Sequence, residues 1–240
     1  MKNVKRVIAC VAVMLGMSTI GFAQSGLSVR VGGSFPVGTF AQGGAGDMAL
    51  TMPASELGAA ATGVNGGVKY QLNILGDLGV FASADLFYNG LKKEVVETMK
   101  DDNENVELPS YMNIPLMVGA NYTLLKFAGA SLWAEAGAGV NLRNITASSA
   151  SAAVGTLISG STESNYDFST SVAWQVGVGV SLSKLSLGVH YYGFGASEIS
   201  GETTTSADLG GILGGETKPM EFTAGKLNPT MLVARVSYTF

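Results

Sequence analysis

A strict alternation of apolar with small or polar residues constrains the fold of this chain more than any other feature. In residues 168–182, apolar side chains stand at every second position, with Gly, Ser, Ala and Gln between them. A period of two places successive side chains on opposite faces of a β-strand. The pattern recurs in eight segments, which are 27–35, 64–71, 78–88, 112–122, 132–143, 168–182, 185–192 and 231–240. The sequence therefore predicts an all-β fold of eight antiparallel, up-and-down strands.

The connectors between these segments alternate in length. Long connectors fall at 36–63, 89–110, 144–166 and 194–229, and short ones at 72–77, 123–131 and 183–184. An even number of strands brings both chain ends to the side that carries the short turns. Short periplasmic turns and long extracellular loops are typical of transmembrane barrels. The long connectors are rich in Gly, Ala, Ser and Thr, and we expect them to be mobile loops.

Composition indicates which face of the predicted barrel points outward. Charged residues make up 13% of the chain and hydrophobic ones 47%, whereas a soluble surface is about a quarter to a third charged. The face opposite the apolar one is mostly Gly, Ser, Asn and Ala, which suits the crowded interior of a narrow barrel. We therefore expect the apolar face to meet lipid. The alternative is a soluble barrel of the lipocalin type, with the apolar face hidden inside.

Aromatic residues lie near both ends of the apolar face, as in the girdles at membrane–water interfaces. The turn-side group is Tyr70, Tyr122, Tyr238 and Phe240, and the loop-side group is Phe35, Tyr88 and Phe168. This distribution also favours a membrane-spanning barrel.

The first 23 residues read as a secretory signal. Lys2, Lys5 and Arg6 precede a short apolar run, and Gly21-Phe22-Ala23 fits a cleavage site. The run is shorter than the roughly 20 residues of a spanning helix. We expect residues 1–23 to be a signal peptide and 24–240 an outer-membrane barrel domain. Membrane anchorage and lipidation at Cys10 remain alternatives.

Removing that segment takes away three of the 14 basic residues, none of the 18 acidic ones, and the only cysteine. The remaining chain is acidic, which argues against nucleic-acid partners because these need basic patches. It also has no disulfide framework. A closed, hydrogen-bonded barrel is one source of the stability that disulfides would otherwise supply.

A few charged residues fall on the face predicted to line the interior. They are Arg30, Lys69, Asp85, Glu135, Arg143 and Arg235. Buried charges are tolerated when they pair. We therefore expect an interior salt-bridge network that makes the barrel rigid. A gate in which the pairs exchange and admit small ions is the alternative.

Enzymatic and metal sites have weak support in the sequence. His190 is the only histidine, it lies in the middle of a predicted strand, and no serine stands at a catalytic spacing from it. Asp101-Asp102-Asn103-Glu104 offers oxygen atoms but lacks the spacing and glycine of a calcium loop. We expect no enzymatic activity, no cofactor and no metal.

Three stretches resemble the outer-membrane β-barrel (porin-like) protein family of Gram-negative bacteria. They are residues 110–116, which contain Tyr-Met-Asn-Ile-Pro-Leu, the Gly-alternating residues 174–180, and the terminal Tyr238-Thr239-Phe240. The resemblance implies a small eight-stranded barrel in the outer membrane. It also implies that Tyr238 and Phe240 are the C-terminal signal read by the barrel-assembly machinery. It does not imply an open pore.

These features together predict a non-enzymatic, monomeric barrel, surrounded by outer-membrane lipid, with a structural role in the envelope. A narrow channel for ions or small solutes is one alternative. The other is surface adhesion or binding through the long loops, where residues 209–215 form an apolar patch.

Overall fold

The structure is a computed structural model, and it describes residues 26–43, 58–101, 106–154, 158–208, 215–216 and 219–240. The predicted signal peptide and residues 209–214 of the apolar patch lie outside these residues. In the described part, no helix is long and apolar enough to cross a membrane.

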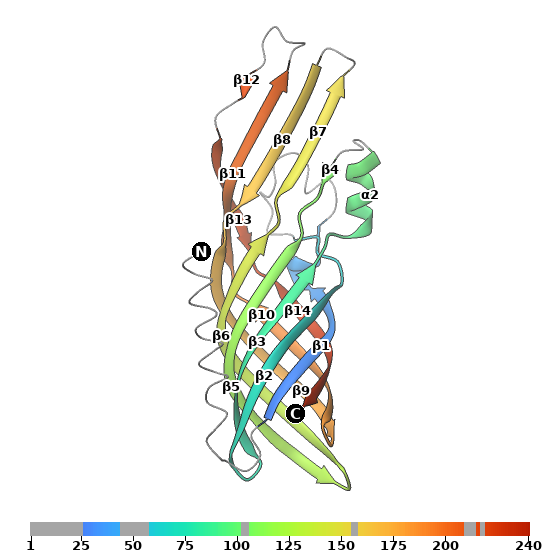
Figure 1. The fold of residues 1–240 in the computed structure, drawn as a ribbon, viewed down its shortest axis with the longest axis vertical. Helices are drawn as coiled ribbons and strands as arrows, with labels where there is room; N and C mark the ends of the chain where they lie inside the picture. Colours follow the sequence, from blue (N-terminus) through green and yellow to red (C-terminus); the bar gives the residue numbers. More distant parts are fainter. Residues whose placement is uncertain (1–25, 44–57, 102–105, 155–157, 209–214, 217–218) are drawn as a thin grey trace.

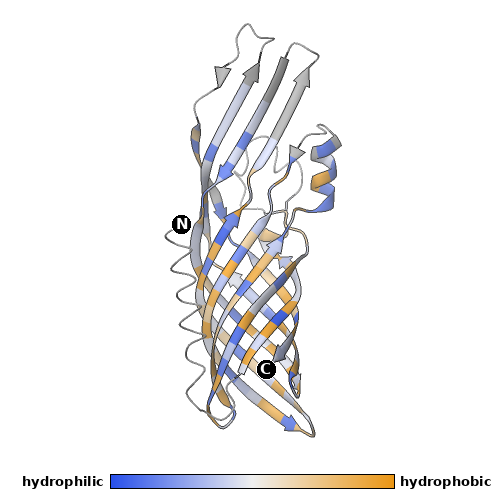
Figure 2. Cartoon of the chain, viewed as in Figure 1, coloured by the Kyte–Doolittle hydropathy of each residue, from blue (hydrophilic) through white to orange (hydrophobic). Residues whose placement is uncertain are grey.

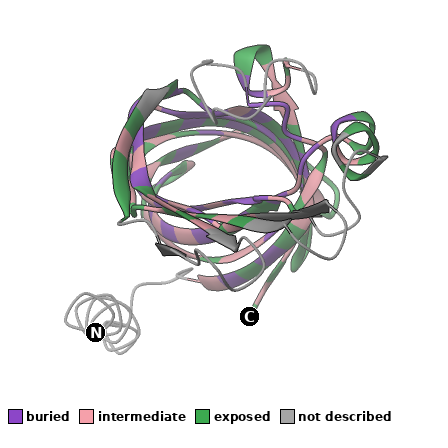
Figure 3. Cartoon of the chain, turned by 90° about the horizontal axis from the view of Figure 1, so that it is seen from above, coloured by how far each residue is buried: buried purple, intermediate pink, exposed green. Residues whose placement is uncertain are grey.

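Eight strands close into one antiparallel barrel (Figure 1), which confirms the predicted fold class. Closure is made by the first and last strands, which pair with Val31 opposite Val236. Seen from above, the strands form a complete ring (Figure 3). The barrel strands are β1 (Gly26–Val37), β2 (Gly63–Leu75), β3 (Leu78–Asn89), β5 (Tyr111–Phe127), β6 (Ala130–Ile145), β9 (Ser169–Leu182), β10 (Leu185–Phe194) and β14 (Thr230–Thr239).

The turns at one end are tighter than the sequence suggested, because only 76–77, 128–129 and 183–184 connect the hairpins. In β2 and β5 the alternation of apolar and polar residues ends before the strand does, because each strand contains a bulge. The register shifts between Asn73 and Leu75 in β2, and between Thr123 and Leu125 in β5. A bulge adds one residue and reverses the facing of those that follow. Gly76 and Gly129 adopt positive φ angles in two of these turns. We call this end the turn side and the opposite end the loop side.

The long connectors, which the sequence predicted as loops, contain regular structure. A second sheet has the order β12-β11-β8-β7-β4, with β13 paired to β11, and β7, β8 and β11 rise beyond the barrel (Figure 1). Both faces of such a sheet can meet water, so its strands need no apolar alternation. Its strands are β4 (Val106–Glu107), β7 (Ser148–Val154), β8 (Ile158–Tyr166), β11 (Ser197–Asp208), β12 (Gly215–Glu216) and β13 (Met220–Leu227).

The remaining elements are a short 3-10 helix, η2 (Gly38–Phe40), and the α-helix α2 (Lys93–Asp101). The side chain of Lys93 lies 3.3 Å from Glu97 one turn later, and Val95 is buried. This helix carries part of the acidic cluster that the sequence raised as a weak calcium site. Residues 102–104 of that cluster lie outside the described part of the chain. Within the described residues, no group of three metal-ligating side chains is brought together.

The predicted facing of the strands is confirmed. Val31, Val178 and Leu187 on the apolar face are 59%, 55% and 54% exposed, whereas Arg30 and Gln175 on the other face are almost fully buried. Hydrophobic and hydrophilic residues alternate along the barrel strands (Figure 2). Six of the seven predicted girdle aromatics have exposed rings on the outer face, namely Phe35, Tyr88, Tyr122, Phe168, Tyr238 and Phe240. A closed barrel with an apolar exterior and a polar interior spans a bilayer.

Candidate functional site: the barrel lumen

Two clusters of charged side chains cross the lumen on its turn side. In the first, Asp85 of β3 lies between two arginines. Nη2 of Arg30 donates to Oδ2 of Asp85 at 2.5 Å, and Nη1 of Arg235 lies 3.6 Å from Oδ1. The hydroxyl of Tyr192 also donates to Oδ2 at 3.3 Å. All of these side chains are buried, so a single carboxylate balances two guanidinium groups.

Arg235 is the less well-paired of the two arginines. None of its three guanidinium nitrogens donates a hydrogen bond to any residue that the structure describes. Its guanidinium carbon lies 5.2 Å from the ring centre of Tyr192 and 6.0 Å from that of Phe87. Contact with aromatic faces is a favourable setting for a cation. The rings therefore supply part of the stabilisation that a second carboxylate would provide.

The second cluster is centred on Glu135 of β6. Its Oε2 accepts from Nζ of Lys69 at 2.5 Å, and its Oε1 accepts from Nε2 of Gln175 at 3.1 Å. Nε2 of His190 lies 3.0 Å from the same Oε1. The Lys69 ammonium also lies 4.6 Å from the ring centre of Phe81. Charge-assisted hydrogen bonds of this kind are about twice as strong as neutral ones, and they join four strands across the lumen.

The small residues of the interior face make room for these side chains. A Cβ atom placed on Gly177 would lie 2.2 Å from Cδ2 of His190, and one on Gly179 would lie 2.3 Å from Cζ2 of Trp133. No larger residue fits at either position without moving the ring. The alternating glycines of β9 are therefore explained by close packing inside a narrow barrel.

Below these clusters, a polar cavity of about 440 Å³ opens on the turn side. Arg30, Lys69, Glu135 and His190 form its inner end. Its outer part is lined by hydroxyl and amide side chains, and at the rim the side chains of Asp77 and Lys126 form an ion pair at 2.5 Å. We call this space the turn-side cavity.

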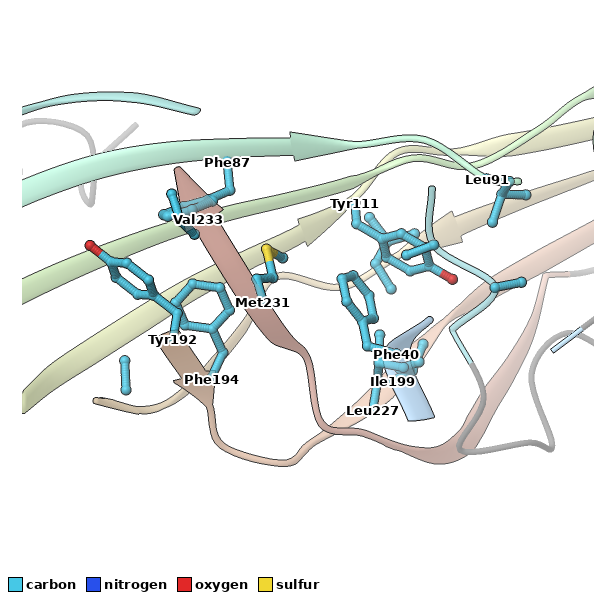
Figure 4. Packing of buried hydrophobic residues seen from close by; sticks show 14 of the residues in the cluster. Phe40, Phe87, Leu91, Tyr111, Tyr192, Phe194, Ile199, Leu227, Met231 and Val233 are labelled. Atoms are coloured by element: carbon cyan, nitrogen blue, oxygen red, sulfur yellow. The ribbon is translucent and has the colours of Figure 1, made fainter. Parts of the chain in front are cut away.

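Above the clusters, the lumen is filled by large apolar side chains (Figure 4). Phe87, Tyr192 and Phe194 pack with ring centres 5.1–5.6 Å apart. These three residues have no exposed surface, and neither do Met231 and Val233 beside them. We call these five residues the aromatic plug. The sequence predicted an interior lined mainly by small residues. That prediction followed from the most frequent residues on the inward face and did not consider the few large residues there.

A second apolar group covers the plug at the mouth of the barrel. Phe40 and Tyr111 lie in edge-to-face contact at 5.1 Å, and the Tyr111 hydroxyl donates to the carbonyl of Gly58 at 2.7 Å. Ile199 and Leu227 from the second sheet belong to the same buried cluster (Figure 4). The connectors on the loop side therefore fold inward over the lumen at their bases.

The structure does not bring Arg143 together with the other five predicted interior charges. Its guanidinium lies at the loop side and donates to the hydroxyl of Ser197 at 2.5 Å and to the carbonyl of Leu227 at 3.1 Å. It also donates to Asn113 at 3.3 Å. None of these acceptors is a carboxylate. Arg143 thus joins the barrel wall to the base of the second sheet.

Several residues of the lumen were not singled out from the sequence. Gln175 and Tyr192 complete the two charged clusters, and Phe87 and Phe194 fill the plug. A signal was present for most of them, since Phe87, Gln175 and Tyr192 fall on the inward-facing positions of their strands. Bulky side chains at such positions have only the lumen to occupy.

The lumen does not assemble a hydrolytic centre from the described residues. His190 contacts the carboxylate of Glu135, but its Nδ1 has no hydrogen-bond partner among the described residues. A nucleophile would need to lie within hydrogen-bonding reach of such a base. Two hydroxyl pairs line the turn-side cavity, and in each pair, Ser181 with Ser186 and Ser28 with Thr239, the two hydroxyls hydrogen-bond to each other at 2.8 Å.

No protein-family model matches this sequence, and no curated protein matches it. Among solved structures, the chain is similar to Neisserial surface protein A, with 13% identity over 92% of this chain and 100% of that chain, and a TM-score of 0.46. It is similar to a major outer membrane protein from Thermus thermophilus, with 13% identity over 91% of this chain and 100% of that chain, and a TM-score of 0.47. It is also similar to the outer membrane protein OprG from Pseudomonas aeruginosa, with 12% identity over 92% of this chain and 98% of that chain, and a TM-score of 0.41.

Proposed function

We propose that this chain is a non-enzymatic, monomeric barrel of the Gram-negative outer membrane, with a structural role in the envelope and a lumen closed to solutes. The observation that carries the proposal is the aromatic plug. Phe87, Tyr192, Phe194, Met231 and Val233 have no exposed surface and occupy the space through which a solute would pass. An eight-stranded barrel is just wide enough for side chains to fill, and these five side chains fill it on the loop side.

Conductance of the refolded barrel in a planar bilayer tests this proposal. We expect no current steps from the unmodified protein. The double variant Phe87→Ala, Phe194→Ala should show steps, because it removes two rings from the plug and leaves both charged clusters in place. Steps from the unmodified protein that change in Arg235→Ala would instead support the narrow gated channel.

Lipid contact of the outer face is tested separately. Val178 is 55% exposed and lies near the middle of β9. Val178→Arg should lower the free energy of unfolding from lipid vesicles by about 2–4 kcal/mol, since a charge then faces the bilayer midplane. Val178→Leu is the matched control. A negligible difference between the two variants would contradict the membrane-spanning assignment.

The aromatic end of β14 is proposed as the signal for the barrel-assembly machinery. Tyr238 and Phe240 contact each other at 5.2 Å and are exposed on the outer face. We expect Phe240→Ala to reduce the amount of barrel in outer-membrane fractions. Phe127→Ala is the control, because Phe127 is another exposed aromatic (57%, against 69% for Phe240) at the end of a strand on the same side. Equal losses would indicate a general effect of the girdle.

Export is proposed to remove residues 1–23. Mass spectrometry of the protein extracted from outer membranes should then give a chain that begins at Gln24. A retained N-terminus, or a lipid on Cys10, would replace this assignment with one of its alternatives.

Binding through the second sheet is the second candidate function. The observation in its favour is that β7, β8 and β11 project beyond the barrel (Figure 1), where rigid scaffolds often present binding surfaces. Replacing residues 198–226 with a short Gly-Ser linker should leave the barrel folded. Loss of cell adhesion to host surfaces in that variant, with normal outer-membrane levels, would support this candidate.

A further inference from the structure

We propose that the turn-side cavity binds a small solute through one carboxylate or phosphate group, with Arg30 and Lys69 as the cationic ligands. The cavity lies on the turn side of the charged clusters, away from the aromatic plug, so a closed lumen and an occupied cavity are compatible. Only its periplasmic location rests on the orientation proposed above.

The first support is an excess of positive charge at the inner end of the cavity. Arg30 and Lys69 line this end together with one carboxylate, Glu135. Behind them, outside the cavity lining, Asp85 lies between Arg30 and Arg235, so three cations face two carboxylates among the described residues of the two clusters. Glu135 is taken by Lys69, and Asp85 is shared by both arginines. Since an unbalanced buried charge is costly, an anion bound nearby would stabilise this end of the lumen.

The second support is unused hydrogen-bonding capacity in side chains that line the cavity. Arg30 is 2% exposed, yet its Nε and Nη1 donate to no residue that the structure describes. Lys69 has three donor hydrogens, and one is directed at Glu135. Oriented donors with spare hydrogens match the oxygen atoms of carboxylate and phosphate groups.

The walls favour a solute with an anionic head and a polar body. The hydroxyls of Ser28 and Thr239 lie 2.8 Å apart on one wall, and those of Ser181 and Ser186 pair on another. The indole of Trp133 also lines the space. At the rim, Asp77 and Lys126 neutralise each other, so the cavity mouth does not repel an anion. A volume of about 440 Å³ falls within the range of small-molecule sites, roughly 300–1,000 Å³.

Trp133 provides a direct readout in the refolded full chain. The other tryptophan, Trp174, is 44% exposed on the outer face, so Trp174→Phe leaves Trp133 as the sole indole emitter. Titrations use inorganic phosphate, acetate and uncharged glycerol, each at constant ionic strength. We expect saturable changes in Trp133 emission with phosphate or acetate and none with glycerol. The stronger of the two anions identifies the favoured head group.

Arg30→Gln should weaken anion binding by about tenfold or more, because it removes a charge-assisted contact. In this variant Asp85 still has Arg235 as an ion-pair partner. Heat-modifiable migration on gels will show that the barrel is folded. Lys69→Gln is the second variant, since Glu135 keeps Gln175 and His190 as partners. Lys184→Gln is the control, because it removes an equal charge on the turn side from a residue that does not line the cavity.

Three results would overturn the proposal. The first is the absence of any saturable change with either anion. The second is an equal response to glycerol, which would indicate a general polar pocket. The third is equal weakening by Lys184→Gln and Arg30→Gln, which would indicate attraction to the net charge and not to a site. None of these outcomes depends on conductance, so the closed-lumen proposal stands or falls independently.

Discussion

The two halves of the lumen are closed in different ways. On the turn side, pairs of charged residues span the barrel, with Arg30 on Asp85 and Lys69 on Glu135, and they leave a polar cavity beneath them. On the loop side, the rings of the aromatic plug fill the same cross-section without exposed surface. The backbone is one continuous barrel, so the difference comes from the side chains alone.

This contrast shows what each kind of interior contributes. Ion pairs are directional, they need partners at fixed distances, and they tolerate space beside them that water or a solute can fill. Aromatic packing is less directional but depends on filling the volume. Tyr192 belongs to both halves, because its ring contacts Phe87 at 5.1 Å and its hydroxyl donates to Asp85. The barrel therefore has one half filled by packed side chains and one half that contains a polar cavity.

The largest expected effect is on the charged half. Asp85→Ala leaves Arg30 and Arg235 buried without their shared carboxylate, and it should lower the free energy of unfolding by about 3–5 kcal/mol. Urea unfolding from lipid vesicles measures this. Asp167→Ala is the matched control, since that carboxylate accepts a hydrogen bond from Ser200 at an exposed site. If both variants lose the same small amount, the charged half contributes little to stability.

The packed half should respond to lost volume and not to lost charge. Met231→Ala removes a fully buried side chain from the plug, and we expect a cost of about 2–3 kcal/mol in the same assay. Met231→Leu keeps the volume and should cost about 1 kcal/mol or less. Similar costs for the two variants would mean that the plug is loosely packed, which would weaken the contrast between the halves.

Tyr192→Phe isolates the link between the halves. The ring contacts remain, and only the 3.3 Å hydrogen bond to Asp85 is lost, so we expect a cost of about 1–2 kcal/mol. Combining it with Asp85→Ala should add almost nothing further, because the hydroxyl then has no carboxylate to contact. If the losses in free energy of unfolding are additive in that double-mutant cycle, the Tyr192 hydroxyl stabilises the barrel through a contact other than Asp85.

The barrel itself could be predicted from the sequence because lipid and lumen impose opposite demands on alternate residues. The eight segments, the lipid-facing side and the alternation of short and long connectors all followed from that demand. Strand ends were missed at Asn73 and Thr123, where bulges reverse the alternation. The second sheet was missed because, outside the membrane, neither face of β7 or β8 has to be apolar.

The contacts inside the lumen were less accessible to sequence reasoning. Inward facing could be assigned residue by residue, but partners depend on strand register and on height along the barrel. Arg143 and Arg235 both face the interior, yet Arg143 contacts Ser197 on the loop side and Arg235 lies beside Asp85.

The effect of Pro115 on strand pairing was also not predicted from the sequence. Pro115 has no backbone N–H to donate, and the pairing of β3 with β5 has a gap at residues 85–86 and 114–115, directly beside the charged cluster.

The smallest expected effect is at the rim of the turn-side cavity, and it sharpens the comparison between buried and exposed charges. Lys126 lies 2.5 Å from Asp77, as close as Arg30 lies to Asp85, but the two rim side chains are 65% and 43% exposed. Water and salt screen such a pair, so Lys126→Ala should cost only about 0–1 kcal/mol. Any cost should fall further when unfolding is repeated at high salt. A loss as large as that of Asp85→Ala would mean that distance, and not burial, sets the strength of ion pairs in this barrel.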